Sequence, residues 1–263
     1  MTTAFDILQS VQSLAPLSMK MDWDNVGLLC GRASAPVHRI LVALDPFEDV
    51  FREAIALEAD CIVTHHPLIF SKLGAVTDET AVGRTVMELI RHDICAINAH
   101  TNLDCAPGGV NDCLAVLLGL DRTEVIDPQG TDSQGRPWGL LRMGLVPPQP
   151  LEAFLSTVKD TLGTPVLRYS QGCDTVRRVA VGGGACGSEL TDAFRAGCDT
   201  FVTSDVKYNQ FWDARDLGMN LIDAGHFYTE NPVCSRLARF LQEKYPDIPV
   251  ILSENHKDCM KFF

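Results

Sequence analysis

The chain has 263 residues and carries 22 lysine and arginine side chains against 34 aspartates and glutamates, a formal net charge of −12. Such an acidic surface repels phosphate backbones, which argues against a nucleic-acid partner held through many phosphate contacts. Hydrophobic residues make up 46% and charged residues 21% of the chain, an ordinary globular composition that excludes a disordered protein.

Signals for targeting or membrane insertion are not found in the sequence. Residues 1–21 lack a basic leader followed by an apolar run, and no stretch approaches the roughly 18 apolar residues of a spanning helix. The ten cysteines are scattered without a C-x-x-C pair, and most lie in apolar stretches, where a reduced cysteine behaves as a small hydrophobe. We therefore expect a soluble, cytoplasmic protein without a membrane partner.

The first half of the chain alternates between helical and strand patterns. Apolar residues at helical spacing predict a helix over residues 5–14, and a loop follows through residues 22–27. This alternation is typical of a mostly parallel sheet with helices on both faces. Further strands are predicted over residues 39–44, 61–64 and 94–99, and further helices over residues 47–57, 80–91 and 110–118.

Between residues 121 and 139 the apolar periodicity lapses, which indicates a domain boundary or an exposed excursion. The α/β pattern then resumes to the end of the chain. Strands are predicted over residues 140–146, 176–181, 200–203, 220–223 and 250–252, and helices over residues 151–162, 188–196, 210–216 and 231–245.

The two halves contain a weak internal repeat of a strand-helix-strand unit. Residues 39–64 and 178–203 follow the same order of elements at an offset of 139 positions, so that Asp60 matches Asp199 and Thr64 matches Thr203. The copies differ directly after the second strand, where the first copy has His65-His66 and the second has Ser204-Asp205. Two related α/β lobes are therefore expected, with the chemistry concentrated in the first.

Histidines and carboxylates come after three of the predicted strands. In open α/β sheets, ligands collect at the carboxyl ends of strands. Each segment also has a purely structural reading: the His pair as a turn residue and a helix cap, Asn102 or Asp104 as an N-cap, and His226 as part of a turn before a helix. The segments are His65-His66-Pro67, His100 to Asp104, and His226 to Glu230, whose i, i+4 spacing places the last two side chains on one helix face.

Three such strand ends together favour a metal site over three coincidences. Imidazole nitrogens and carboxylate oxygens suit zinc, iron(II) or manganese. The candidate ligands outnumber what one tetrahedral ion needs, which favours two divalent ions about 3.5 to 4 Å apart. These ligands are His65, His66, Asp104, His226 and Glu230.

In its sequence motifs the chain resembles a known family, the GTP cyclohydrolase I type 2 homologues, also called NIF-three-like proteins. The matching motifs extend over nearly the whole chain in the family's order. They are residues 24–28 (Asp-Asn-Val-Gly-Leu), 64–68 (Thr-His-His-Pro-Leu), 100–104 (His-Thr-Asn-Leu-Asp), 181–184 (Val-Gly-Gly-Gly), and Gly225-His226 with Glu230.

The resemblance implies a dinuclear metal site with the same five ligands. It also implies a ring-shaped homohexamer and a C-terminal segment that returns to the first lobe. The lobes would then comprise residues 1–125 with 224–263, which bind the metals, and residues 126–223. The chain departs from longer relatives because its 121–139 segment is too short to hold their inserted domain.

Two further segments have both a functional and a structural reading. Gly182-Gly183-Gly184 could receive a phosphate on backbone N–H groups, or it could be a tight turn. Lys207 or Tyr208 could contact an anionic substrate, or they could mark a solvated helix start.

The leading functional hypothesis is a dinuclear metal-dependent hydrolase acting on a small molecule. By resemblance, the substrate would be a purine nucleotide whose imidazole ring is opened. His100, outside the five ligands, could carry a proton or orient Asp104. The alternatives are a non-enzymatic metal carrier or regulator, and a metal-dependent phosphoesterase.

Overall fold

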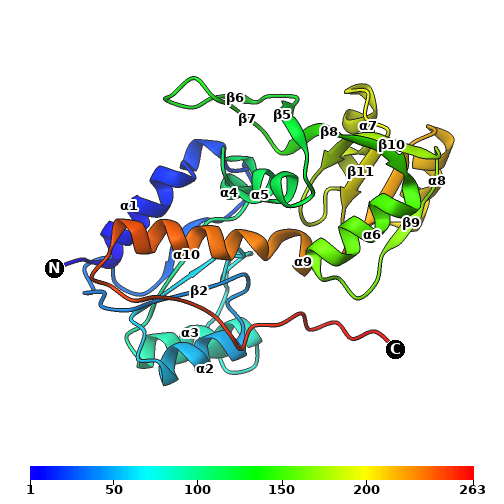
Figure 1. The fold of residues 1–263 in the computed structure, drawn as a ribbon. Coiled ribbons are helices and arrows are strands. Elements are labelled where there is room, and N and C mark those ends of the chain that lie inside the picture. Colours follow the sequence, from blue (N-terminus) through cyan, green and yellow to red (C-terminus); the bar gives the residue numbers. More distant parts are fainter. The chain divides into compact units, whose positions relative to one another are not determined.

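The structure is a computed structural model that describes all 263 residues (Figure 1). The chain folds into two compact units. Unit 1 comprises Met1–Leu103 and Val233–Cys259, and unit 2 comprises Asp104–Pro232 and Met260–Phe263. None of the helices is both long enough and apolar enough to cross a membrane.

Unit 1 is built on a five-stranded sheet with the strand order β1-β4-β3-β2-β13. The four strands from β4 to β13 are parallel, and β1 pairs antiparallel with β4 at the edge. Every residue of β2, β3 and β4 is buried, as expected for parallel strands covered on both faces. The strands are β1 (Gly27–Cys30), β2 (Ile40–Ala43), β3 (Cys61–Thr64), β4 (Cys95–Asn98) and β13 (Val250–Leu252).

Helices cover both faces of this sheet. Figure 1 shows α1 (Ala4–Leu14) and α10 (Pro232–Lys244) on one side of β2, and α2 (Glu48–Ala56) and α3 (Ala81–Arg91) on the other. On the second side, Phe51 of α2 and Leu89 of α3 pack with Ile62 of β3 in one apolar cluster. The short helices are η1 (Leu17–Met19) and α4 (Thr101–Cys105), which spans the boundary between the units.

Unit 2 contains a six-stranded mixed sheet with the order β5-β8-β10-β11-β12-β9. Its three parallel strands are β10 to β12, and the outer strands are antiparallel. The strands of this unit are β5 (Asp121–Ile126), β8 (Leu141–Pro150), β9 (Arg168–Ser170), β10 (Thr175–Val181), β11 (Thr200–Thr203) and β12 (Asn220–Asp223), with the hairpin β6 (Gly130–Thr131) and β7 (Pro137–Trp138).

Alternate residues of these strands face two different apolar clusters. Val202 of β11 packs with Leu114 of α5 and Phe154 of α6, whereas its neighbour Phe201 packs with Ala193 of α7 and Ala214 of α8. The sheet is therefore covered by helices on both faces. The helices are α5 (Val110–Leu117), α6 (Leu151–Leu162), α7 (Leu190–Arg195), α8 (Tyr208–Asp216), α9 (His226–Glu230) and the 3-10 turn η2 (Gly187–Glu189).

The predicted repeat is confirmed at the level of backbone register. Ile40 pairs with Cys61 in unit 1, and Val179 pairs with Thr200 in unit 2, which keeps the 139-residue offset in both strands. Asp60 accepts hydrogen bonds from the backbone N–H groups of His38 and Arg39, and Asp199 accepts them from Arg177 and Arg178. The same carboxylate turn therefore precedes the second strand of each copy.

The predicted α/β fold is confirmed, while several local expectations differ from the structure. The loop expected over residues 22–27 leads into β1, and the irregular segment expected over residues 121–139 contains β5, β6 and β7. These strands are short or lie at sheet edges, and the first four residues of β5 are exposed, so they lack the apolar runs that mark buried strands. The edge strand β9 was missed for the same reason.

The lobe boundaries expected from the sequence differ from those of the two units. Residues 104–125 and 224–232, expected in the first lobe, belong to unit 2. The physical reason is packing: Leu114 of α5 and Leu118 at its C-cap join the core around Phe154, and β5 pairs with β8. Residues 233–259 do return to unit 1, where β13 adds to the sheet beside β2.

Candidate metal centre

Three histidines come after adjacent parallel strands of unit 1. His65 and His66 come directly after β3, and His100 comes two residues after the end of β4. Because β3 and β4 are paired in parallel, their carboxyl ends meet, and the backbone N–H of Ala99 donates to Thr64 O at that edge. Ligand atoms of the three imidazoles lie within 4.8 Å of one another, and His65 is fully buried.

Each of these imidazoles has its Nδ1 atom engaged by an oxygen. His65 Nδ1 donates to the carbonyl of Ala99 at 2.9 Å, and His66 Nδ1 donates to Asp45 Oδ1 at 2.6 Å. His100 Nδ1 donates to Asp24 Oδ1 at 2.9 Å. A proton on Nδ1 leaves the Nε2 lone pair as the ligand atom, and partners of this kind hold metal-binding histidines in one orientation.

Asp24 joins His100 to the start of α4. Its second carboxylate oxygen accepts from the backbone N–H of Thr101 at 3.0 Å and from the Thr101 hydroxyl. Burial raises the pKa of Asp24, but the hydrogen bonds with His100 and Thr101 outweigh burial and lower the pKa to about 2. Asp24 therefore stays ionised at neutral pH and holds the His100 ring.

Asp45 plays the corresponding part for His66. Its other oxygen, Oδ2, lies 2.9 Å from His256 Nε2 in the C-terminal segment. Although burial raises the pKa of Asp45, the hydrogen bonds with His256 and His66 hold it well below the ordinary value. The Asp45 carboxylate thus connects a candidate ligand to the segment that returns after β13.

Unit 2 groups the other three predicted ligands. His226 and Glu230 lie one turn apart on α9, with His226 Nε2 3.0 Å from Glu230 Oε2, so the predicted i, i+4 placement is confirmed. Oxygens of Asp104 and Glu230 lie within 4.8 Å of each other, and both residues are buried. Burial, followed by the charges of Asp104 and Glu230, raises the pKa of the neighbouring Cys186 thiol.

His226 is oriented by a second carboxylate. Its Nδ1 lies 2.7 Å from Asp205 Oδ2. Burial lowers the pKa of His226, but the hydrogen bonds with Asp205 and Glu230 outweigh burial and raise the pKa to about 10. The imidazole therefore lies between two acidic groups, an environment that also suits a bound cation.

The glycine loop after β10 forms part of the support for this group. Gly183 N donates to Asn111 Oδ1 at 2.7 Å and Gly184 N donates to Thr229 Oγ1 at 3.1 Å, so these N–H groups are used within the protein. Gly184 has φ +67°, and a Cβ there would overlap Glu230 Oε1. The tight-turn reading therefore fits the loop better than a phosphate site.

Asn111 connects the glycine loop to the backbone of Asp104. This fully buried amide donates to Asp104 O at 3.2 Å and to Leu140 O at 2.6 Å, while its oxygen accepts from Gly183. A single side chain thus ties together three segments of unit 2. Its position fixes the backbone at Asp104 relative to the loop that touches Glu230.

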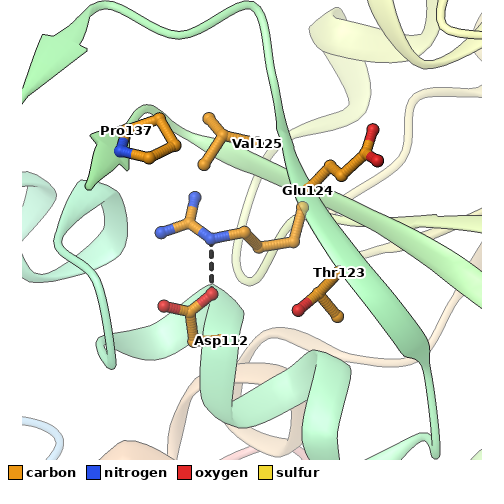
Figure 2. Close-up of a pocket in the computed structure, with 6 residues that line it drawn as sticks. Asp112, Thr123, Glu124, Val125 and Pro137 are labelled. Atoms are coloured by element: carbon orange, nitrogen blue, oxygen red, sulfur yellow. Dashed lines mark hydrogen bonds and ion pairs between the residues drawn. The ribbon is translucent and has the colours of Figure 1, made fainter. Parts of the chain in front are cut away.

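A separate pocket of about 310 Å³ in unit 2 contains none of the predicted site residues (Figure 2). The buried Arg142 guanidinium in its wall bonds to Asp112 and to four backbone carbonyls, so its donors are already used within the protein. Those carbonyls belong to Gly139, Leu141, Cys105 and Ala106. The pocket is lined by Asp112, Thr123, Glu124, Val125, Pro137 and Arg142. Arg142 therefore supports the backbone that follows Asp104.

Sequence reasoning missed the carboxylate partners of the histidines, Asp24, Asp45 and Asp205. Asp205 is the repeat counterpart of His66, since 66 + 139 = 205, and that offset was the signal that could have found it. Lys207 is at the N-cap of α8 and Tyr208 is 78% exposed, which agrees with the solvated helix start.

The donor chemistry of both groups fits divalent metal ions. Unit 1 offers imidazole nitrogens with engaged Nδ1 atoms, and unit 2 offers two buried carboxylates and an imidazole. Mixed nitrogen and oxygen ligands of this type are typical of zinc, iron and manganese sites. The fold and these groups define the class: an α/β protein with candidate metal ligands at the carboxyl ends of its strands.

Comparison with known proteins identifies the family. The family model Duf34/NIF3 (NGG1p interacting factor 3) matches residues 2–259. The chain is 34% identical over 260 residues to a protein of Clostridium perfringens named GTP cyclohydrolase 1 type 2 homolog, with 98% of each chain covered. The chain therefore belongs to the Duf34/NIF3 family.

Two further relatives place the chain within that family. A Halalkalibacterium halodurans protein of the same name is 28% identical over an alignment of 363 positions, covering 97% of this chain and 98% of that protein. Because that alignment is longer than the chain, this relative contains residues with no counterpart here. The crystal structure of a Bacillus cereus protein related to NIF3 superimposes with a TM-score of 0.93 at 27% identity, covering 100% of this chain and 99% of the other.

Proposed function

We propose that the protein is a dinuclear metal-dependent hydrolase with five metal ligands. Unit 1 would supply His65 and His66, and unit 2 would supply Asp104, His226 and Glu230. The observation that carries the proposal is the orientation of the imidazoles. His65 and His66 each have Nδ1 fixed by an oxygen, so Nε2 is the ring nitrogen with the lone pair for a metal ion, and His226 Nε2 lies beside the candidate ligand Glu230. Two divalent ions would supply an acidified water and would stabilise negative charge as it develops.

The protein's own residues have separable roles in this proposal. The five ligands hold the ions, while Asp45 and Asp205 keep the rings of His66 and His226 in place. His100 is bonded through Nδ1 to Asp24, so its Nε2 is the atom that would accept or return a proton. His100 also belongs to the imidazole group of unit 1, and metal stoichiometry will distinguish a ligand from a proton carrier.

The substrate in this proposal is a purine nucleotide whose imidazole ring is opened by water. Support comes from the relatives named GTP cyclohydrolase 1 type 2 homolog. The acidic net charge of −12 favours a small substrate over a polymeric nucleic acid. A ring-shaped homohexamer in the cytoplasm completes the proposal by family resemblance.

Elemental analysis of freshly purified protein, followed by turnover assays with each metal found, tests this function. We expect two ions per chain, ring opening of GTP, and loss of turnover on exhaustive chelation. His65→Ala and Glu230→Ala should each lower metal content, because a missing ligand weakens binding by more than the roughly 10- to 100-fold loss caused by a supporting residue. His92→Ala and Glu243→Ala, on the exposed surface, serve as matched controls.

Three results would contradict the proposed hydrolase function or favour another function. Full hydrolysis by chelated protein would exclude the metal mechanism. A metal that transfers readily to an acceptor protein, with no turnover across nucleotides and phosphoesters, would identify a carrier instead. Turnover of phosphoesters without ring opening would identify a phosphoesterase.

A further inference from the structure

Unit 1 exposes two large aromatic side chains beside each other. Trp23 is 63% exposed and Phe70 is 56% exposed, although both are large and apolar. Their ring centroids lie 5.8 Å apart with an angle of 59° between the ring planes. Scattered exposed apolar residues are ordinary, but two aromatic rings in contact with each other form a patch that calls for an explanation.

The aromatic pair lies against the histidine group of the same unit. The His100 ring is 6.2 Å from Trp23 and 6.1 Å from Phe70, with edge-on angles of 73° and 79°. His100 in turn lies 5.3 Å from His65 and 5.5 Å from His66. The exposed rings and the candidate metal ligands therefore share His100 as a common neighbour.

Hydrogen bonds hold the segments that carry the two rings. Asn25 Nδ2 donates to the carbonyl of Ile69 at 2.6 Å, which joins the segment of Trp23 to the segment of Phe70. Asp24, next to Trp23 in sequence, is bonded to both His100 and Thr101. Because both segments are fixed in this way, little ordering is needed when a ligand binds to the rings.

The charges around the rings favour an uncharged part of a ligand. Asp22 is exposed next to Trp23, and it would repel a phosphate. The Lys20 ammonium donates to the carbonyls of Met21 and Asp24, both at 3.1 Å, so it is already engaged. Of the lysines near the two rings in sequence, Lys20 is therefore engaged and Lys72 is exposed, so the patch itself offers ring faces.

We propose that Trp23 and Phe70 form a stacking surface for the planar heteroaromatic ring of the substrate, with an edge of that ring toward His100. Ring faces of this kind bind nucleobases by stacking, with little dependence on which base is present. This inference rests on the proposed function for its location beside a reacting site, and it names the substrate class: a compound with a planar ring such as a purine. The phosphate of a nucleotide would lie away from the aromatic pair.

Binding of guanosine 5′-monophosphate, measured by calorimetry on the full chain with and without metal, tests the proposal. Ribose 5-phosphate, which lacks the ring, is the comparison ligand. Trp23→Leu and Phe70→Leu should each weaken guanosine 5′-monophosphate binding about fivefold to 100-fold and leave ribose 5-phosphate binding unchanged. Trp23→Phe keeps an aromatic face and should retain most of the affinity.

Trp212→Leu provides a matched control, since Trp212 is 49% exposed but lies in unit 2 beside Arg215. Guanosine 5′-monophosphate should quench the fluorescence of the native protein and of Trp212→Leu, and this quenching should be lost in Trp23→Leu. Circular dichroism verifies that each variant is folded. Light scattering reports whether any substitution changes the oligomeric state.

Several outcomes would overturn the inference. Equal affinity of all variants for guanosine 5′-monophosphate would exclude stacking, as would equal affinity of the native protein for the nucleotide and for ribose 5-phosphate. A change of oligomeric state in Trp23→Leu without a change in nucleotide affinity would identify the patch as a contact between copies of the chain. Ring-dependent binding that survives chelation, in a protein without turnover, would retain this inference while removing the hydrolase proposal.

Discussion

The two units place a histidine–carboxylate pair at the same edge of related sheets, but from different positions in the repeat. In unit 1 the imidazole is His66, after β3, and its partner Asp45 comes after β2. In unit 2 the position equivalent to His66 is Asp205, which comes after β11. Its carboxylate supports His226, and His226 comes after the next strand, β12. The frame is thus shared, but in unit 2 the His66 position carries the supporting carboxylate and the imidazole comes from a different strand.

This difference explains the glycine at position 184. At the 139-residue offset Gly184 is the counterpart of Asp45, because 45 + 139 = 184. Unit 1 needs a carboxylate at that turn to hold His66, whereas unit 2 needs space there for Glu230, whose oxygen a Cβ at 184 would overlap. Where a repeat changes its chemistry, the supporting position changes with it.

Gly184→Ala should have the largest effect among changes that test this comparison. The left-handed φ of +67° costs an alanine about 1–2 kcal/mol, and displacement of the Glu230 carboxylate adds about 1–3 kcal/mol of overpacking. We expect a clear fall in the free energy of unfolding, measured with urea, together with weaker metal binding.

Gly163→Ala is the control for that experiment. Gly163 also has φ +67°, yet a Cβ there would meet nothing within 4 Å. The two variants therefore share the backbone penalty and differ in the clash. If both lose the same stability and the same metal affinity, then close approach to Glu230 is not the reason for a glycine at 184.

Asp45→Asn and Asp205→Asn compare the supporting carboxylates directly. Each should lower metal affinity by about 10- to 100-fold, because a ring without its carboxylate partner is less basic and less well oriented. The side chain of Asp45 is 17% exposed and that of Asp205 is 52% exposed, so solvent weakens the second interaction more. We expect Asp45→Asn to have the larger effect in competitive chelator titrations.

Asp213→Asn supplies a surface control on α8, and thermal unfolding distinguishes lost affinity from lost folding. An equal loss of metal affinity in Asp45→Asn and Asp205→Asn would mean that solvent exposure does not determine how strongly each carboxylate supports its histidine. Unchanged affinity in both would mean that the carboxylates do not support metal ligands.

Much of the fold could be predicted because its central strands are buried on both faces. β3, β11 and β12 were predicted with the bounds that the structure has, since continuous apolar runs identify such strands. β1, β5 and β9 were not predicted, because strands at a sheet edge can be short and can contain polar residues. The boundary between the units was not predicted either, because the packing of α5 against Phe154 joins residues that are far apart in the sequence.

The candidate site was predictable to a similar degree, and for a similar reason. His65 and His66 adjoin a recognisable strand, and the spacing of His226 and Glu230 depends only on helix geometry. Asp24 could not be assigned from spacing, because its bond to His100 joins residues 76 positions apart. Partners of this kind emerge only when the loops are seen in three dimensions.

Acid titration provides the smallest of these effects and tests the Asp24 partner. The folded-state pKa of Asp24, about 2, lies below the ordinary unfolded value of about 3.9. A lowered carboxyl pKa contributes stability that is fully present above the unfolded value and is lost as pH falls through the folded value. The contribution, on the order of 1–2 kcal/mol, should therefore disappear between about pH 4 and pH 2.

Asp24→Asn should remove this part of the pH dependence. Native protein and variant should differ in melting temperature by a few degrees at pH 6 and converge toward pH 2, because protonated Asp24 can no longer accept as a carboxylate from His100 and Thr101. Asp205, whose pKa is also lowered but whose side chain is half exposed, should give a smaller difference in the same scan. A constant gap between native protein and Asp24→Asn from pH 6 to pH 2 would show that Asp24 acts through its shape and packing rather than through its charge.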